Sequence, residues 1–476
     1  MLEGLEAVEL QRSDLNDELR FDSQYFQKRY LLEDKCRRHF KSISLGNQAF
    51  ITDGPHGYHE VDEDSPIAML TAKCAKKWFA NRNDADTISL DTHNSNLRSS
   101  LEIDDLILST RGTVGACAIV QKEALPSNID QDVARIVLAK NADITPRYLL
   151  TYLNSRFGQD WITRNSTGMV QQGLSLVKVR ELPIPLLPKE FQEKISKTVE
   201  TASLQLRFAA ERFEQAETTL LRALGLENWQ APEPLSYIRS SRDAFAAGRL
   251  DAEYFHPAKT IALATLDKLS DQTVSDIFDS IRELWQPTNG PAPATNLVRN
   301  YDLTDALNPF LDAAKEPVER AAIASTKKKI RAGDLVVSRL RSYLKEIAIV
   351  QPSSKIPMVA STEFIVLRPK SMSSLPVEAL MIYLRSLLPQ LVFKWSQDGS
   401  NHPRFDEKEL LRLPVPRILI EQANDYVKTV RSIIAEREQA TQLLDAAKRA
   451  VEIAIEDSEA AALAYCNDAL SQYTTP

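Results

Sequence analysis

Two long stretches of the chain carry apolar residues at a helical spacing. In the first, the apolar positions are Phe191, Ile195, Val199, Ala202, Leu206, Ala209, Phe213, Ala216 and Leu220. In the second, they are Leu419, Ala423, Tyr426, Val430, Ile433, Ala440, Leu444, Ala447, Val451 and Ala454, with Arg437 as the interruption. Steps of three and four residues are the heptad rhythm of coiled coils. The pattern predicts two long helices, each with one apolar seam.

Proline and glycine mark where these helices begin and end. Each helix follows a Pro-x-Pro segment, LPIPLLPKE at 182–190 and LPVPRILIEQ at 413–422, and Gly225 is placed to end the first one. A run of about 34 residues spans about 50 Å at 1.5 Å per residue. An apolar seam has to be buried. Antiparallel pairing of the two helices would bury both seams, and packing of each helix on its own globular domain is the alternative.

The segments at 40–160 and 265–400 have a different pattern. LILSTRGTVGACAIV at 106–120 and LVVSRLRSYLKEIAIV at 335–350 are β-branched, apolar runs with a central break, and FIVLRP at 364–369 is a short strand-like run. Gly-Pro clusters at 54–57 and 287–293 indicate turns. These features predict two globular α/β or α+β domains with twisted sheets.

The chain also repeats itself. RFDSQYF at 20–26 returns as RLDAEYF at 249–255, and the runs at 104–120 and 333–350 keep nearly the same offset. TGMVQQGLSLVKVRELPIPLLPKEFQEKI, which starts at 167, returns as DGSNHPRFDEKELLRLPVPRILIEQANDY, which starts at 398. Three segments in one register indicate a duplicated unit of roughly 230 residues, far longer than a solenoid repeat.

The duplication and the long helices together predict an α+β protein with internal pseudo-two-fold symmetry. Two globular domains are expected to be joined by two long antiparallel coiled-coil helices. The expected boundaries are a first domain at 1–188, a first long helix at 189–226, a second domain at 227–416, a second long helix at 417–460 and a C-terminal tail at 461–476.

Composition narrows the functional classes. At 476 residues the chain exceeds what one hydrophobic core supports, and its net charge of −7 argues against a polycationic binder. Four scattered cysteines predict reduced thiols. The acidic N-terminal stretch lacks the apolar core of a signal peptide, and no run of about 18 to 20 apolar residues could cross a bilayer. We therefore expect a soluble, cytoplasmic protein without a membrane partner.

The sequence lacks the common catalytic motifs. It contains no GxxxxGK[ST], GxGxxG, GxSxG or HExxH pattern and no Cys/His cluster. His56 and His59 lie near Asp53 and Glu60, but this set is too sparse for a metal site, and a polar loop is favoured. We expect no catalytic residue, no metal and no cofactor.

Positive charge is concentrated in one segment of each half. TAKCAKKWFANR at 71–82 has four Lys or Arg and no acid, and KKKIRAGDLVVSRLRSYLKE at 327–346 has seven Lys or Arg against two acids. A solvated basic face explains either segment alone. Their occurrence in corresponding domains favours DNA, since Lys and Arg contact phosphates while Arg, Asn, Gln and His in loops read base edges.

The chain resembles the specificity (S) subunit of type I restriction–modification systems over nearly its whole length. The resemblance rests on the repeated opening motifs, the DGPHGYHE loop at 53–60, the paired runs described above, STEFIVLRP at 361–369 and the two Pro-x-Pro helix starts. The second half lacks the DGxHG loop, and Arg111-Gly-Thr becomes Leu340-Arg-Ser. Such divergence is what two domains that read different sequences would show.

The resemblance implies a non-catalytic, DNA-binding subunit of a phage-defence system. Each target-recognition domain would read one half of a bipartite double-stranded DNA target. The paired helices would fix the unread spacer, and about 50 Å of helix can hold two readers one DNA turn apart, about 34–36 Å. Partners would be methyltransferase subunits, expected to number two, and restriction/translocase subunits. The methyltransferase subunits would supply the S-adenosylmethionine chemistry.

The residues expected to contact DNA lie in loops of both domains. In the first domain they are Gly54, His56, Tyr58, Lys73, Lys76, Arg111, Gln171 and Gln172. In the second domain they are Arg339, Arg341, Lys345, Asn401, His402 and Arg404. For the loop glycines, turn geometry alone is the alternative. Two other functions stay open: an assembly scaffold that does not bind DNA, and the same recognition module in another defence system.

Overall fold

The computed structural model describes residues 8–10, 22–57, 59–75, 78–82, 85–168, 173–287, 296–352 and 356–471. The chain divides into two compact units, residues 1–206 with 438–476, and residues 207–437. The division falls inside both long helices, α6 (Lys189–Ala223) and α14 (Ala423–Glu456). Both units mix sheets and helices, so the expected α+β class is confirmed.

The first unit is built on a five-stranded sheet in the order β2-β9-β6-β7-β4, a three-stranded sheet β5-β3-β8 and a pair β1-β10. The strands are β1 (Ser42–Ser44), β2 (Ala49–Asp53), β3 (Ala68–Leu70), β4 (Trp78–Phe79), β5 (Asp86–Thr87), β6 (Leu106–Ser109), β7 (Cys117–Ile119), β8 (Ser127–Ile129), β9 (Val133–Leu138) and β10 (Pro183–Pro185). The helices besides α6 and α14 are α1 (Lys28–Arg37), α2 (Leu90–Ser95), α3 (Pro146–Asn154), α4 (Arg156–Asn165), α5 (Leu176–Glu181) and α15 (Glu459–Ser471).

The second unit has two five-stranded sheets, β12-β21-β18-β19-β15 and β13-β17-β20-β14-β16, and a pair β11-β22. The strands are β11 (Ser270–Thr273), β12 (Phe278–Ile281), β13 (Leu284–Trp285), β14 (Leu297–Tyr301), β15 (Phe310–Leu311), β16 (Val318–Glu319), β17 (Lys327–Ile330), β18 (Leu335–Ser338), β19 (Ile347–Val350), β20 (Met358–Ala360), β21 (Phe364–Pro369) and β22 (Pro414–Pro416). The helices are α7 (Ser241–Ala247), α8 (Pro257–Lys268), α9 (Val274–Ile277), α10 (Val377–Arg385), α11 (Leu387–Lys394), α12 (Glu407–Leu411) and α13 (Arg417–Glu421).

The main sheets of the two units share one topology. Strand order β2-β9-β6-β7-β4 corresponds to β12-β21-β18-β19-β15, and in both sheets only the last pair is parallel. A buried ion pair also recurs. Arg135 Nε donates to Asp105 at 2.7 Å, and Arg368 Nε donates to Asp334 at 2.7 Å. The sequence repeat is therefore a repeat of structure.

The Pro-x-Pro segments are edge strands that lead into the long helices. β10 pairs with β1 and β22 pairs with β11, both antiparallel. Proline cannot donate to a ladder, so such segments belong at an edge. Buried tyrosines hold them in place: the Tyr152 hydroxyl donates to the Pro183 carbonyl at 2.8 Å, and the Tyr383 hydroxyl donates to the Pro414 carbonyl.

The predicted helix ends are found close to where proline and glycine indicate them. Gly225 has a φ of 71°, and the Leu226 N–H donates to the Leu221 carbonyl at 2.8 Å, which is the hydrogen bond of a Schellman cap. The second helix differs from expectation in detail. It is split into α13 and α14, and the expected tail contains α15.

Each unit buries its own part of the helical seam. In the first unit the apolar positions of α6 from Phe191 to Ala202 share a core with those of α14 from Ala440 to Ile455. In the second unit Ala209 to Leu220 share a core with Ala423 to Ile434. The globular part of each unit contributes to the same core, so within each unit the seam serves both helix pairing and domain packing.

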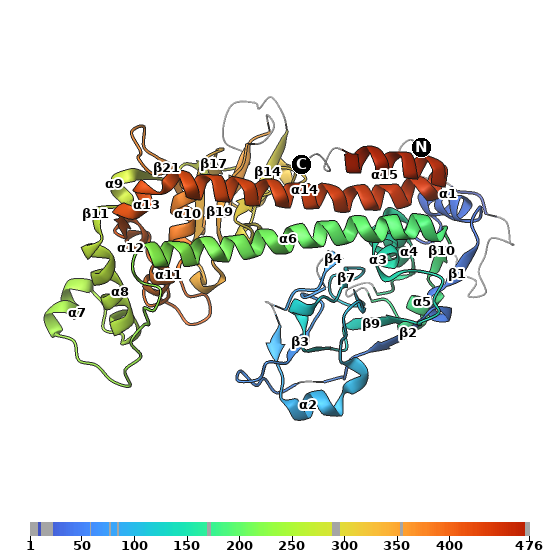
Figure 1. The fold of residues 1–476 in the computed structure, drawn as a ribbon, viewed down its shortest axis with the longest axis horizontal. Helices are drawn as coiled ribbons and strands as arrows, with labels where there is room; N and C mark the ends of the chain where they lie inside the picture. The colour runs from blue at the N-terminus through green and yellow to red at the C-terminus, as the bar shows by residue number, and fades with distance from the viewer. Residues whose placement is uncertain are drawn as a thin grey trace. The chain divides into compact units, whose positions relative to one another are not determined.

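Helices α3 and α4 connect the first sheet to α6, beside which they lie (Figure 1). Thr145 is the N-cap of α3, and its backbone N–H donates a hydrogen bond to the Gln192 side-chain oxygen of α6 at 2.9 Å. The Thr145 hydroxyl lies 2.9 Å from that of Ser196. These polar contacts fix the register of the first sheet against the helix.

Candidate nucleic-acid interface

In each unit, a loop after the central strand of the main sheet meets a turn that precedes the Pro-x-Pro strand. In the first unit the loop follows β6, and Arg111 forms a β-bridge with Gly173. In the second unit the loop follows β18, and Leu340 forms the equivalent bridge with Arg404. The loop that carries Arg111 and the loop that carries Arg339 and Arg341 therefore lie at the same structural position in the two units.

In the second unit, one acid binds two of the candidate arginines. Arg339 Nε donates to Glu363 at 3.0 Å, and Arg404 makes two bonds to the same carboxylate at 3.0 and 2.9 Å. These hydrogen bonds hold the pKa of Glu363 below its usual value. Both arginine side chains remain about 40% exposed, at 41% and 40%. The cluster keeps a net positive charge, with two oriented guanidinium groups at the surface.

The outermost candidates of the second unit lie beside this cluster. The Arg341 N–H donates to the Pro403 carbonyl at 3.0 Å, and Arg341 Nη2 lies 3.4 Å from His402 Nδ1. Asn401 and His402 are exposed. The structure thus brings Arg339, Arg341, Asn401, His402 and Arg404 together at one surface, from segments about 60 residues apart.

Sequence reasoning missed Tyr343. It lies in the same loop, in the short 3-10 turn η8 (Ser342–Leu344), and its side chain is 64% exposed. An exposed aromatic ring next to arginines can stack on a base or pack on a sugar. The signal that could have revealed it is the aromatic residue between the basic residues of RLRSYLK.

The basic run at 327–346 does not form one positive face. Lys327 Nζ lies 3.0 Å from Asp302, and Lys328 Nζ donates to the Phe364 carbonyl at 2.7 Å. Burial lowers the pKa of Lys328. Lys345 Nζ lies 3.2 Å from Glu217 of α6. Because strand residues alternate between faces, a run of charges that crosses β17 and β18 is divided among several partners.

In the first unit, the candidate segments converge on the turn at 130–132. The Gly54 N–H donates to the Asp130 carbonyl at 3.1 Å, and the Arg111 N–H donates to the Asp132 carbonyl at 3.2 Å. The side chain of Arg111 is 58% exposed and lies 3.4 Å from the Asp132 carboxylate. Chiefly because it is buried, the pKa of Asp130 is raised to about 6. The segment that carries Lys73 reaches the same turn, because the Asp130 N–H donates to the Leu70 carbonyl at 3.1 Å.

The described candidates of the first unit differ in whether they are exposed for contact with DNA or are required by packing. The exposed His56 has Nε2 3.3 Å from an Asp53 carboxylate oxygen, and Lys73 is exposed. A Cβ on Gly54 would lie 1.8 Å from the Ile129 carbonyl oxygen, so this glycine is required by packing. Tyr58, Lys76, Gln171 and Gln172 lie outside the described residues.

Within the described ranges, no group of three or more His, Cys, Asp or Glu side chains could hold a metal ion. Over the same ranges, no helix is both long and apolar enough to cross a bilayer. Cys36, Cys74, Cys117 and Cys466 are free, as expected for reduced thiols.

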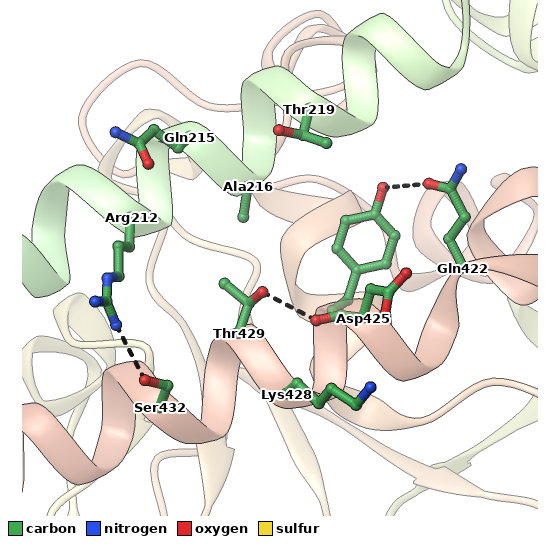
Figure 2. Close-up of a pocket in the computed structure, with 10 residues that line it drawn as sticks. Arg212, Gln215, Ala216, Thr219, Gln422, Asp425, Lys428, Thr429 and Ser432 are labelled. Atoms are coloured by element: carbon green, nitrogen blue, oxygen red, sulfur yellow. Dashed lines mark hydrogen bonds between the residues drawn. The ribbon is translucent and has the colours of Figure 1, made fainter. Parts of the chain in front are cut away.

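A second surface feature of the second unit is a groove between α6 and α14, with a volume of about 680 Å³. Figure 2 shows its polar lining, in which Arg212 Nη1 donates to the Ser432 hydroxyl at 3.1 Å and the Tyr426 hydroxyl donates to Gln422 at 3.3 Å. The remaining lining residues are Gln215, Ala216, Thr219, Asp425, Lys428 and Thr429. None of the candidate DNA contacts lines this groove.

Comparison with known proteins identifies part of this arrangement. Residues 73–217 match the family described as "Type I restriction modification DNA specificity domain". This segment is therefore similar to a type I DNA specificity domain. It contains Arg111 and Gly173 and ends within α6. The resemblance of the chain to type I specificity subunits is confirmed.

Solved structures of the same kind are similar over most of their length. The S subunit of a type I restriction–modification system from M. genitalium is 14% identical, with 88% of this chain and 95% of that chain covered and a TM-score of 0.37. The HsdS subunit from Thermoanaerobacter tengcongensis is 15% identical, with 88% and 97% covered and a TM-score of 0.29. A third chain, from a study of complex assembly and conformational transition of the type I R-M system, is 15% identical, with 88% and 98% covered and a TM-score of 0.28. No curated protein matches the sequence.

Proposed function

We propose that the chain is the DNA-reading subunit of a restriction–modification complex and that each unit reads one half of a bipartite, double-stranded target. The specificity-domain match supports DNA recognition. The proposal extends to both halves because one loop-and-turn site recurs on sheets of the same topology. It lies at Arg111–Gly173 in the first unit and at Leu340–Arg404 in the second. In this proposal the chain has no catalytic residue and no cofactor. Partner subunits methylate and cleave the DNA in the cytoplasm.

In the second unit, Arg339, Arg341, Asn401, His402 and Arg404 are the proposed contacts. A guanidinium can bind the O6 and N7 atoms of guanine, and a side-chain amide can bind N6 and N7 of adenine. Glu363 supports this role because it fixes two guanidinium groups while it leaves them exposed. Arginines held in one orientation lose less conformational freedom when they bind.

In the first unit, His56, Lys73 and Arg111 are the proposed contacts. Tyr58, Lys76, Gln171 and Gln172 stay proposed on the sequence alone. Gly54 is not proposed as a contact because the close approach of its backbone to Ile129 explains why a glycine is there. Lys345 is also left out, since it has a different partner.

The long helices are proposed to fix the distance between the two half-sites and to dock the partners, two methyltransferase subunits and the restriction/translocase subunits. The shared apolar cores of α6 and α14 support pairing of the two helices within each unit. The groove that Arg212 and Tyr426 line is the proposed docking surface of the second unit. An open, polar groove between helices suits a partner that also exists free in solution.

Methylation mapping of host DNA with and without this gene tests the proposal. We expect one split motif with a fixed spacer to lose methylation when the gene is removed. Unchanged methylation would contradict the proposal and favour an assembly scaffold. The genes beside this one distinguish type I from another defence system that uses the same module.

The spacer gives a second measurement on the same cells. Seven residues inserted into both α6 and α14 lengthen each helix by about 10 Å, which is about three base pairs of DNA. The mapped spacer should then grow by about that amount while both half-sites stay the same. A spacer that did not change would rule out the role of the helices as a ruler.

A further inference from the structure

The loop after β18 has an unfavourable backbone conformation at two positions. Arg341 has a φ of 48° and Lys345 has a φ of 51°, and they flank the 3-10 turn η8. Residues with a Cβ adopt this left-handed conformation only when surrounding contacts hold it. The first unit places Gly112, with a φ of 72°, and Gly115, with a φ of 89°, at the corresponding positions. The second unit must therefore use contacts to stabilise a left-handed backbone conformation that glycine adopts without strain in the first unit.

Lys345 is held at both its backbone and its side chain. Arg385, the last residue of α10, donates from Nη1 to the Lys345 carbonyl at 2.6 Å. The Lys345 ammonium donates to Glu217 of α6 at 3.2 Å. Glu217 also lies 3.9 Å from Arg385 Nε, so one carboxylate faces two cations.

Two members of this triad lie largely out of solvent, and Lys345 is 38% exposed. The side chains of Glu217 and Arg385 are only 18% and 14% exposed, and the Arg385 guanidinium stacks over Phe213 of α6, 5.0 Å from the ring centroid. Charges that are both buried and hydrogen-bonded give a defined geometry, because any other arrangement leaves one of them unpaired. The triad therefore fixes the end of the loop against α6.

A second set of contacts holds the middle of the loop. Gln397 Nε2 donates to the Ser342 hydroxyl at 2.6 Å, and Arg249 Nη2 donates to the Gln397 carbonyl at 3.0 Å. Arg249 is fixed by Asp251 through two bonds of 2.7 and 3.0 Å. Arg249 and Asp251 belong to the repeated opening motif RLDAEYF. The loop is thus held between that motif and α6, with Arg341 at its start.

We propose that Glu217, Arg385 and Lys345 are positioning residues, which hold the 339–346 loop and hence Arg341 in the conformation that reads the second half-site. This inference rests on the proposed function. It makes Lys345 a support for the loop and not a phosphate contact. Recognition by the second unit then depends on an acid of α6, the helix that is proposed to dock partner subunits.

Glu217→Gln distinguishes the two possible roles of Lys345, because they predict opposite changes in affinity for the mapped target. The full chain with its methyltransferase subunit is titrated with two DNA duplexes, one with the mapped target and one with the second half-site replaced. A positioning role predicts that discrimination between the duplexes falls about tenfold, within the range of one mismatched base pair. If Lys345 instead contacted phosphate, neutralising Glu217 would release it and tighten binding to both duplexes, which would overturn the proposal.

Glu211→Gln is the matched control. It makes the same change of charge on the same helix, in an exposed pair with Arg207 at 3.6 Å, and should leave discrimination unchanged. Thermal denaturation of each variant reports whether the fold is retained.

Lys345→Gln tests the proposal with a second variant, because the two roles predict different losses. A positioning role predicts that discrimination between the duplexes falls, as for Glu217→Gln. A phosphate contact at 345 would instead weaken binding to both duplexes alike and leave their ratio unchanged, which would overturn the proposal. If the wild-type complex did not discriminate between the duplexes, the proposed function would fail. If it discriminated and Glu217→Gln left the ratio unchanged, only the positioning role would fail.

Discussion

The loops after β6 and β18 occupy the same place in sheets of the same topology, but they achieve their shape differently. In the first unit Gly115 takes the left-handed conformation without a Cβ, and Gln159 Nε2 donates to its carbonyl at 2.9 Å. In the second unit Lys345 takes the same position, and Arg385 donates to its carbonyl at 2.6 Å. The duplicated fold therefore keeps the left-handed backbone at this position and a hydrogen bond to its carbonyl. The donor differs, since it is Gln159 of α4 in the first unit and Arg385 at the end of α10 in the second, and the side chains that the loop carries differ as well.

The ion pairs beneath the loops, which we call the framework, are formed by the same residue types in both units. The buried pairs Asp105–Arg135 and Asp334–Arg368 connect the same strands. Both carboxylates also accept a backbone N–H from three residues earlier, from Glu102 and Arg331, at 2.8 Å in each case. A shared framework with divergent loops is what two readers of different DNA sequences require.

The largest expected effect comes from breaking that framework. Asp105→Asn and Asp334→Asn should each lower the free energy of unfolding by about 3 kcal/mol, because each leaves a partly or fully buried arginine without its charge partner. Urea denaturation of the full chain measures the loss. Asp271→Asn, in the exposed pair with Arg417, is the control and should cost less than about 1 kcal/mol. A small effect in one unit and a large effect in the other would show that the two pairs are not energetically equivalent.

The loop glycines give an intermediate effect. A Cβ at Gly115 would lie 3.1 Å from both Gln159 Oε1 and Ile162 Cγ2, whereas at Gly112 the nearest atom is Ala72 Cβ at 3.6 Å. Gly115→Ala should therefore destabilise by about 2 kcal/mol and Gly112→Ala by about 1 kcal/mol, the cost of the backbone conformation alone. Thermal denaturation measures both. Equal losses would mean that the backbone and not the packing limits the residue at 115.

A dependence on pH that only one unit carries at this position gives a different kind of test of the comparison. Burial, and then the neighbouring Asp160 carboxyl, raise the pKa of Glu33 in α1 to about 8. The corresponding position 229 residues later is the buried Ala262. Since the folded state holds the Glu33 proton more tightly than the unfolded state does, this contribution to stability is full below about pH 4.5 and is lost as the pH rises through about 8.

This direction of the pH dependence is tested by comparing the urea midpoints of the wild type and of Glu33→Gln from pH 5 to 9. The difference between the two proteins should change steadily across that range, in the direction of relative loss for the wild type. Asp130, with a pKa raised to about 6, contributes in the same direction in both proteins and so cancels from the difference. A constant difference would contradict the shifted pKa of Glu33.

Much of the fold could be predicted from the sequence, because local rules decide it. Heptad spacing indicated α6 and α14, Gly225 marked the cap of α6, and the FIVLRP run coincides with β21. The loops could not be predicted in the same way. Arg341 and Lys345 occupy a conformation that their residue types disfavour, and contacts distant in sequence hold them there.

The candidate site was predicted only in part, again because contacts between residues distant in sequence decide its geometry. The arginine and histidine candidates of the second unit do gather at one surface, but a one-dimensional charge count could not show that Lys327, Lys328 and Lys345 each have an acid or a carbonyl as partner. Glu217 and Lys345 are 128 residues apart, and nothing in the sequence near either indicates the other.

A double-mutant cycle between protein and DNA tests whether each unit reads its own half-site. Binding of wild type, Arg111→Ala and Arg341→Ala is measured on the mapped target and on duplexes with either half-site replaced. We predict that Arg341→Ala couples by about 1–3 kcal/mol to one half-site only and that Arg111→Ala couples to the other. If both variants coupled to the same half-site, or neither coupled to any, the two-reader account would be contradicted.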